Sequence, residues 1–222
     1  GILNDPIPHC HIVTTTTHKT LRGPRGGLIL MGQDFDNPFG IKLKNGSLRK
    51  MSSLLDSAIF PGNQGGPLEH VIAAKAVAFG EALSENFLHY ILQVKKNAKV
   101  MADEFIKRDY KIISGGTDNH MLVVETSSSF GLDGRQAEEV LDEVNITTNK
   151  QIIPDDPNPP LRPSGIRMGT PAATARGMLE EDMRQLGAWI LKCLKNSQDK
   201  NLLGEIRGEV KKFCERFPVP GI

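Results

Sequence analysis

A long helical stretch in the middle of the chain constrains the fold more than any other sequence feature. Pro67 suits the first position of a helix, where a backbone N–H would have no partner in any case. Apolar residues then recur at three- and four-residue spacing, which predicts a helix packed on one side. The first series is Leu68, Val71, Ile72, Ala76, Phe79 and Leu83, and the second, running toward Arg108, is Leu88, Ile91, Ala98, Met101 and Phe105. Because a helix this long commonly joins two domains, we predict one domain over residues 1–83 and another over residues 84–222.

Short β-type runs precede this helix. Residues 11–17 combine β-branched side chains with four consecutive threonines, which predicts a strand. Residues 23–27 are typical of a turn, and residues 28–31 are entirely apolar. Because a wholly apolar strand is usually buried on both faces, we expect residues 28–31 to lie inside an α/β sheet.

Beyond the helix the pattern becomes α+β. Residues 111–114, 121–124 and 165–169 predict extended segments, and Asp133 with Gln136 forms a candidate capping box at the start of a helix. Residues 150–163 hold five prolines and two aspartates, a composition unsuited to either helix or strand. Two amphipathic helices close the sequence. Their apolar residues are Leu179, Met183, Leu186, Ile190 and Leu194 in the first, and Ile206, Val210, Phe213 and Phe217 in the second.

The composition argues against several classes of protein. Lys and Arg number 27 and Asp and Glu 26, so the net charge of +1 gives no basic surplus for nucleic acid. No apolar run approaches the roughly 20 residues of a membrane helix. Cys10, Cys193 and Cys214 form no CxxC pair, which favours a reducing compartment over a disulfide framework or a zinc site. We therefore expect a cytoplasmic protein without a metal, with Cys193 and Cys214 in the core.

Lys19 is the candidate reactive residue. It lies between the threonine-rich strand and the glycine-rich turn. A lysine that forms a Schiff base must spend time as a neutral amine, and burial or a nearby positive charge favours that form. Arg22, Arg25 and the following apolar strand offer both influences. Since an arbitrary lysine is far more often a solvated charge, local chemistry alone leaves both interpretations open.

Four segments, in order along the chain, carry a resemblance to one family. Residues 13–27, VTTTTHKTLRGPRGG, closely resemble the cofactor-lysine segment of serine hydroxymethyltransferases. Residues 60–67, FPGNQGGP, resemble the glycine loop of that family. Residues 145–150, NITTNK, resemble the strand entering its folate-side loop, and residues 162–171, RPSGIRMGTP, resemble its substrate-carboxylate segment. The resemblance extends over essentially all 222 residues.

This resemblance implies a fold-type I pyridoxal-phosphate enzyme. The expected α/β architecture is the C-terminal part of an aminotransferase-like large domain followed by a small α+β domain. Lys19 would hold pyridoxal 5'-phosphate through a Schiff base, Thr16 would hydrogen-bond near that bond, and Arg25 would supply positive charge. His18 lies near the site in the family, although a histidine beside a strand end is at least as often structural.

The resemblance also implies binding residues. Gly65 and Gly66 would approach the cofactor phosphate of a partner subunit, which implies a homodimer or a dimer of dimers; glycine backbone and a helix N-terminus both suit an anion. Arg167 would bind the substrate α-carboxylate through two parallel hydrogen bonds, which a lysine cannot make. Asn149 matches the family pattern on the folate side. Gln151 stands where many bacterial relatives carry asparagine, and the same contact is expected there.

The implied reaction is reversible transfer of the serine hydroxymethyl carbon to tetrahydrofolate, giving glycine and 5,10-methylenetetrahydrofolate. The family's ring-stacking, pyridine-pairing and acid–base residues belong to an upstream half with no counterpart here. We therefore expect this chain to be a segment that is inactive and poorly folded alone. Two alternatives remain open: a folate-independent sister enzyme of the threonine aldolase type, which the 149–163 loop argues against, and a noncatalytic half that serves assembly or regulation.

Overall fold

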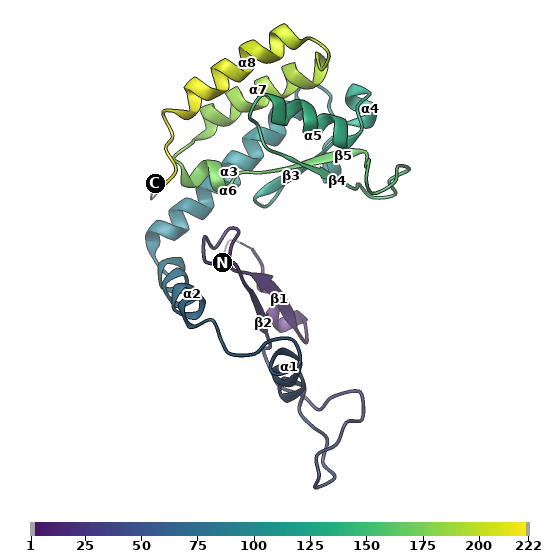
Figure 1. The fold of residues 1–222 in the computed structure, drawn as a ribbon, viewed down its shortest axis with the longest axis vertical. Helices are drawn as coiled ribbons and strands as arrows, with labels where there is room; N and C mark the ends of the chain where they lie inside the picture. Colours follow the sequence, from purple (N-terminus) through teal and green to yellow (C-terminus); the bar gives the residue numbers. More distant parts are fainter. Residues whose placement is uncertain (1–2, 221–222) are drawn as a thin grey trace. The chain divides into compact units, whose positions relative to one another are not determined.

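The computed structural model describes residues 3–220, and the chain divides into two units, Gly1–Phe87 and Leu88–Ile222 (Figure 1). Each unit contains both helices and strands, which confirms the mixed α/β class, with one sheet of two strands and one of three. The assignment of these parts to a large and a small domain stays a prediction. No helix in the described part of the chain is long and apolar enough to cross a membrane.

A two-stranded hairpin opens the first unit. Strand β1 (Val13–Thr16) pairs antiparallel with β2 (Gly27–Leu30). The predicted burial of β2 on both faces is wrong, since Ile29 and Leu30 are 42% and 39% exposed. Among the described residues β2 pairs with β1 alone, so its apolar side chains lack the second neighbouring strand of an α/β sheet.

Other short elements complete this part of the chain. They are a 3-10 helix, η1 (Ile7–His9), and a nine-residue helix, α1 (Met51–Ile59). The irregular segment before α1 is organised by the buried side chain of Asn37. Its Nδ2 donates to the carbonyls of Ile41 and Arg49 at 2.8 and 2.6 Å, and its Oδ1 accepts from the N–H of Ile41 at 3.0 Å. One amide thus replaces the hydrogen bonds that a regular element would provide.

The single long helix predicted from Pro67 onward is in fact two helices, α2 (Glu69–Ala82) and α3 (Glu85–Ile106). Ser84 lies between them. Its hydroxyl accepts from the N–H of Phe87 at 3.2 Å and donates to the carbonyl of Glu81 at 2.6 Å. A serine bonded in this way caps the N-terminus of a new helix, so the backbone ends one helix and begins the next at this point.

The predicted apolar stripe of α2 is not its buried side. Ile72 and Leu83 are 55% and 90% exposed, whereas Ala78 is buried. Ala78 faces the hairpin together with Lys75, because a Cβ added at Gly23 would lie 3.1 Å from the Ala78 Cβ. The side chains of α2 itself are small or apolar on nearly all of its faces. Its sequence therefore offered little contrast between a buried and an exposed face.

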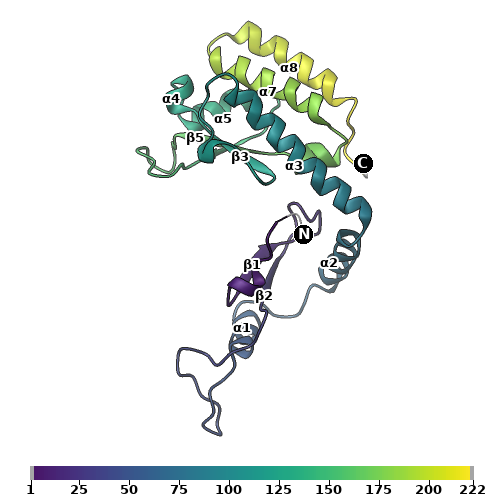
Figure 2. The same ribbon diagram turned by 180° about the vertical axis from the view of Figure 1, so that it is seen from behind.

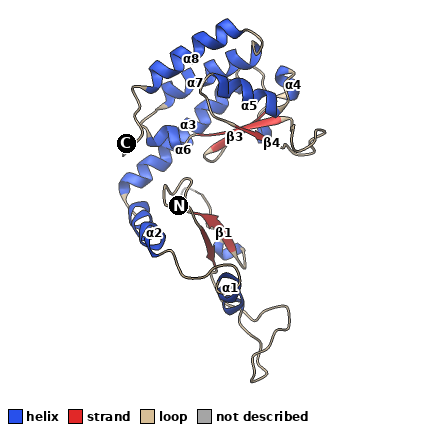
Figure 3. Cartoon of the chain, viewed as in Figure 1, coloured by secondary structure: helices blue, strands red, loops and turns tan. Residues whose placement is uncertain are grey.

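A three-stranded antiparallel sheet forms the base of the second unit. Its order is β3 (Met121–Glu125), β5 (Gly165–Gly169) and β4 (Asn149–Gln151), which Figure 3 draws in red. Helix α5 (Gly134–Glu143) packs on β4 and β5, and α7 (Glu180–Lys195) packs on α5 (Figures 1 and 2). One face of the sheet is therefore covered by helices.

Four further elements complete the second unit: η2 (Ile113–Gly115), α4 (Ser127–Phe130), α6 (Pro171–Ala175) and α8 (Lys200–Cys214). The two closing helices predicted from the sequence, α7 and α8, are confirmed and pack on each other. Burial of Cys193 in the core is confirmed, and Cys214 is partly buried and packs against this core. The core includes Phe105, Leu141, Ile166, Ile190 and Leu203.

Local signals in this unit were mostly interpreted correctly. The capping box is present: Asp133 Oδ1 accepts from the N–H of Gln136 at 2.8 Å, and Gln136 Oε1 accepts from the N–H of Asp133 at 3.0 Å. The predicted strands at 121–124 and 165–169 are confirmed. Residues 152–164 lack helix and strand as predicted, although Lys150 and Gln151 belong to β4.

The strand predicted at residues 111–114 is wrong. Ile112 alone pairs there, through an isolated bridge to Val124, and η2 begins at the next residue. Ser114 has a φ of +67°, outside the β region. The apolar pair that suggested a strand instead contributes Ile112 to the core, where one residue is enough.

Candidate functional site

The loop that carries Lys19 joins β1 to β2 and is built around Thr17. The Thr17 side chain is fully buried, and its hydroxyl lies 2.6 Å from the carbonyl of Pro24, to which it donates. The backbone of Thr17 donates to the carbonyl of Gly26 at 3.1 Å and accepts from the N–H of Gly23 at 2.8 Å. These bonds close both ends of the loop onto one residue. Thr17 was not singled out in the sequence, where it is one of four threonines in a row.

Two glycines allow α2 to approach this loop. A Cβ at Gly23 would lie 3.1 Å from the Ala78 Cβ, and a Cβ at Gly26 would lie 2.8 Å from Lys75 Cε. The Nζ of Lys75 donates to the carbonyl of Gly27 at 3.1 Å. Lys75 thus holds the loop to α2, a role that the sequence analysis missed. The available signal was a lysine in an otherwise apolar part of the helix.

Lys19 lies at the tip of the loop with its side chain exposed, so the predicted burial of this side chain is wrong. The carbonyl of Lys19 accepts from the N–H of Arg22 at 2.9 Å, which makes a tight turn, and Arg22 takes the left-handed conformation with a φ of +55°. The guanidinium of Arg22 lies 5.7 Å from the ring centre of Phe87. Within residues 3–220, Lys19 Nζ makes no ion pair or hydrogen bond, so its amine is open to a ligand.

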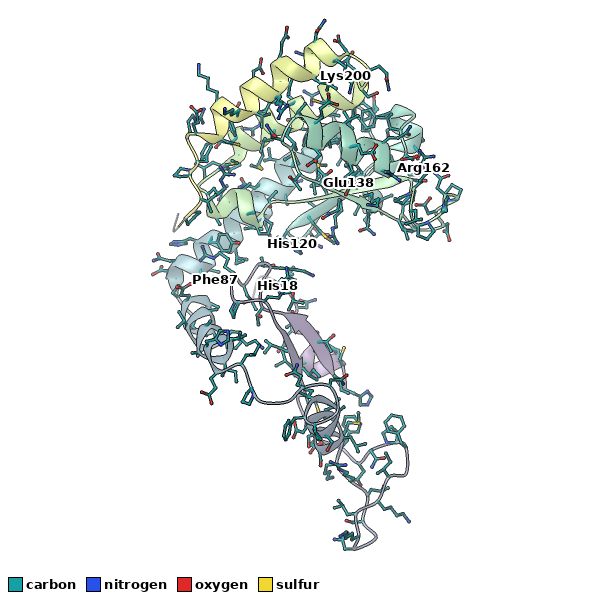
Figure 4. All side chains as sticks on the ribbon, in the orientation of Figure 1. His18, Phe87, His120, Glu138, Arg162 and Lys200 are labelled. Carbon is teal, nitrogen blue, oxygen red and sulfur yellow. The ribbon has the colours of Figure 1, made fainter. Side chains whose placement is uncertain are left out.

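The other residues predicted around Lys19 differ in their surroundings. Thr16 ends β1 and is half-buried, while Arg25 is exposed. His18, labelled in Figure 4, is half-buried, and its Nδ1 accepts from the N–H of Gly26 at 3.4 Å. This bond gives His18 a structural part in closing the loop, which agrees with the structural interpretation left open from the sequence.

Gly65 and Gly66 lie in an exposed segment ahead of α2, which begins at Glu69 rather than at Pro67. A Cβ at either glycine would meet no atom within 4 Å. Their N–H groups make no hydrogen bond within the described residues. Free backbone donors close to the start of a helix fit an anion such as a phosphate. The carboxylate of Glu69 lies in the first turn of the same helix and is the one local feature that opposes an anion there.

In the second unit, Arg167 and Asn149 lie next to each other across two strands. Residue 167 on β5 pairs with residue 149 on β4, and Arg167 Nη2 lies 3.5 Å from Asn149 Oδ1. Ile166 and Met168 point into the core, so alternation places Arg167 on the face of the sheet that the helices leave open. Within the described residues its guanidinium has no carboxylate partner. It is therefore available to bind a carboxylate ligand.

Gln151 is placed differently from Asn149. It pairs with Gly165 at the end of β4, and its Nε2 donates to the carbonyl of Ile152 at 3.0 Å. The structure therefore brings Asn149, but not the amide of Gln151, to Arg167. The loop of Lys19 and the strand of Arg167 belong to different units. No group of three or more His, Cys, Asp or Glu side chains suited to a metal ion occurs among residues 3–220.

Comparison with known families bears on both the Lys19 loop and the Arg167 strand. The family model of serine hydroxymethyltransferase matches residues 1–190, most of the chain. This chain belongs to the serine hydroxymethyltransferase family. The match includes the Lys19 loop, the Gly65–Gly66 segment and the Arg167 strand, whereas helix α8 lies beyond it.

Serine hydroxymethyltransferases are transferases that use pyridoxal phosphate, and the residues of this chain fit part of that cofactor. The open amine of Lys19 fits its aldehyde, and the free N–H groups of Gly65 and Gly66 fit its phosphate. Thr16, which is half-buried, adds a hydroxyl group at the start of the lysine loop. The donor set is therefore consistent with the cofactor of the family.

Proposed function

We propose that this chain contributes to the reversible transfer of a hydroxymethyl group between serine and tetrahydrofolate. The observation that carries the proposal is the open amine of Lys19, on a loop fixed by Thr17, in a chain of the serine hydroxymethyltransferase family. The fixed loop supports the proposal because a reactive side chain acts best on a rigid base.

The residues of the first unit would hold the cofactor. Lys19 would bind pyridoxal phosphate covalently through Nζ, and the N–H groups of Gly65 and Gly66 would bind its phosphate. Thr16 would hydrogen-bond beside Nζ, and the charge of Arg25 would favour the neutral amine of Lys19. When bound, this cofactor supplies an electron sink for cleavage of bonds at the amino acid α-carbon.

The residues of the second unit would hold the substrates. The guanidinium of Arg167 would bind the α-carboxylate of serine or glycine through two N–H groups, with Asn149 limiting the orientations of the arginine. Asn149 and Gln151 would contact the folate. The two parallel hydrogen bonds would fix the direction of the amino acid, which a single point charge could not do.

Assembly and location follow as parts of the same proposal. We propose a homodimer or a dimer of dimers in the cytoplasm, acting on small molecules without nucleic acid or a membrane. The exposed apolar side chains of α2, including Ile72 and Val77, support an assembled state because an isolated unit would leave them in water. The same exposure favours the second candidate, a segment that serves assembly alone.

Titration with pyridoxal phosphate tests the proposal. The protein should develop a visible absorbance band that is lost in Lys19→Ala and retained in Lys44→Ala, a matched control at another exposed lysine. Absence of a Lys19-dependent band would support the assembly-only candidate. The measurement should be made on the 222-residue chain and on any longer natural form of it.

Serine cleavage assayed with and without tetrahydrofolate tests the reaction. We expect formation of methylenetetrahydrofolate that requires both substrates. Cleavage at the same rate without folate would instead identify a folate-independent enzyme of the aldolase type. Turnover by the 222-residue chain alone would overturn our expectation that this segment is inactive by itself.

A further inference from the structure

The proline-rich loop of residues 152–164 joins the two strands that carry Asn149 and Arg167. Five prolines in residues 150–163 restrict its backbone, but the loop has no helix or strand of its own to fix its path. A single side chain supplies the missing contacts. Asp156 lies within this loop, half-buried, and accepts four hydrogen bonds from it.

The Asp156 carboxylate joins the two ends of the loop. Its Oδ2 accepts from the N–H of Ile153 at 3.1 Å and from the N–H of Ser164 at 2.9 Å. Ile153 follows β4 by two residues, and Ser164 immediately precedes β5. The last paired residues of the two strands are Gln151 and Gly165. The carboxylate therefore continues the β4–β5 pairing beyond the point where backbone pairing ends.

The second oxygen of Asp156 orders the turn itself. Its Oδ1 accepts from the N–H of Asn158 at 2.9 Å and from the hydroxyl of Ser164 at 2.7 Å. Asn158 Nδ2 in turn donates to the same hydroxyl at 2.9 Å. Burial by itself acts to raise the pKa of Asp156, but the hydrogen bonds from Ser164, Asn158 and Ile153 outweigh it and lower this pKa to about 2. The carboxylate is thus ionised and fully engaged at neutral pH.

Helix α5 holds the outside of the same hairpin, as the labelled Glu138 and Arg162 in Figure 4 indicate. Glu138 accepts from both the N–H and the Nζ of Lys150, each at 3.1 Å. Arg162 Nε lies 3.2 Å from Asp133 Oδ2, and Gly134 donates its N–H to the carbonyl of Pro163 at 2.5 Å. These contacts hold β4 and the end of the loop to α5, whereas the Asp156 carboxylate bridges Ile153 and Ser164, just beyond the Gln151–Gly165 pair.

We propose that Asp156 is a positioning residue that fixes β4 against β5 and thereby holds Asn149 beside Arg167. The inference rests on the proposed role of Arg167 in binding the carboxylate of serine. Asp156 does not touch the substrate; it acts through the loop. Loss of its bonds allows the end of β4 to separate from β5, and the Asn149–Arg167 contact loosens with it.

A matched pair of variants tests this role. Asp156→Asn removes the charge and leaves one acceptor oxygen, so at least one of the Ile153, Asn158 and Ser164 N–H groups faces an NH₂ donor instead of an acceptor. The control variant, Asp155→Asn, removes the same charge one residue away, at an exposed position. Asp155 has a φ of +53°, a conformation that asparagine tolerates. We expect amide exchange at Asn149 and Gln151 to speed up about tenfold in Asp156→Asn, the effect of one lost hydrogen bond, and to stay unchanged in Asp155→Asn.

Kinetics with serine, measured on a natural form of the protein that includes this chain and turns over serine, supply the second readout. For Asp156→Asn we expect the KM for serine to rise about tenfold with little change in kcat, because binding depends on the position of Arg167 and chemistry does not. A merely structural role would lower the amount of active protein and hence the apparent kcat, with KM unchanged. Equal KM and equal β4 exchange in the two variants would overturn the proposal. If no natural form of the protein that includes this chain acts on serine, the proposed function fails, and β4 exchange alone still decides whether Asp156 fixes the strand.

Discussion

At the scale of single residues, the structure separates groups that look alike in the sequence. Thr14, Thr15, Thr16 and Thr17 are identical in type, yet only Thr17 is fully buried and bonded to Pro24. The fixed loop around Lys19 therefore depends on Thr17, whereas the family pattern emphasises the neighbouring Thr16. In the second unit, Asn149 and Gln151 are both amides on β4, but only Asn149 reaches Arg167.

Thr17→Val should loosen the lysine loop. Valine keeps the shape of threonine but removes the hydroxyl donor, which leaves the carbonyl of Pro24 without its partner at a cost of about 1–3 kcal/mol. Amide exchange at Gly23 should report this as a lower free energy of local opening. Thr14→Val, at an exposed position of β1, is the control and should leave exchange unchanged. Equal exchange in both variants would contradict the assigned role of Thr17.

Arg167→Lys should weaken binding of serine although the charge is kept. A lysine offers a point charge in place of two parallel N–H donors, and a hydrogen bond to a charged group contributes about 1.5–3 kcal/mol. In a natural form of the protein that includes this chain and turns over serine, kcat/KM should therefore fall by about 10- to 100-fold. Arg207→Lys on α8 serves as the control, because Arg207 is exposed and far along the chain from the sheet. A value equal to that of the control would exclude Arg167 as the carboxylate ligand.

At the scale of elements, local signals were predicted well and burial was not. The capping box of α5 and the strands at 121–124 and 165–169 are recognisable because their cause lies within a few residues. The exposed sides of β2 and α2 were missed because burial depends on what packs against an element. The helix break at Ser84 was missed because its cap resembles any other surface serine.

Among the candidate site residues, those carried by a local sequence pattern were predicted, and those whose role depends on distant contacts were not. Arg167 and Asn149 were predicted from the resemblance of their segments to the family, but their contact depends on the register of β5 against β4, which appears only in the fold. Lys75, Thr17 and Asp156 were missed because their roles arise from hydrogen bonds to distant backbone groups. Such contacts have no period in the sequence, so only the folded chain reveals them.

The N-cap of α5 offers a direct test of an element. Asp133→Ala removes the acceptor for the N–H of Gln136 and should lower the free energy of unfolding by about 0.5–2 kcal/mol in urea denaturation. Asp142→Ala, on the exposed side of the same helix, controls for loss of an acidic residue. The two variants should differ by most of that amount. Similar midpoints for both would show that the cap contributes little.

Acid should loosen the proline-rich loop through Asp156. Burial acts to raise the pKa of Asp156, but hydrogen bonds led by those from Ser164 lower it from 3.8 to about 2. A carboxylate with a depressed pKa stabilises the folded loop fully above pH 3.8, and this contribution is lost as the pH falls toward 2. Exchange at Ser164, corrected for its intrinsic rate, should rise over this window in wild type but not in Asp156→Asn. The same profile in both proteins would refute this assignment.

At the scale of the whole molecule, the apolar core is distributed unevenly. The second unit contains a continuous core of buried residues from α3, the sheet, α5, α7 and α8. In the first unit, Ala78 is the one fully buried apolar residue among those described. Since burial of apolar surface provides most of the stability of a fold, the two units should differ greatly in their capacity to fold alone.

Separate expression of the two units tests this difference. Residues 88–222 should unfold cooperatively in urea, and Leu141→Ala should lower their free energy of unfolding by about 2–5 kcal/mol because Leu141 is fully buried. Residues 1–87 should show no cooperative transition by circular dichroism. A sharp transition in that fragment would mean that its exposed apolar side chains do not limit its stability.

The uncovered side chains of β2 and α2 also have a consequence for the cell. Ile29, Ile72 and Val77 are the kind of surface that molecular chaperones bind and that quality-control proteases detect. A ribosome would expose this surface before residues 88–222 emerge, since synthesis runs from the N-terminus. We expect the lifetime of the newly made chain to depend on how soon another polypeptide surface covers it, so its abundance should follow the supply of that surface more closely than its own rate of translation.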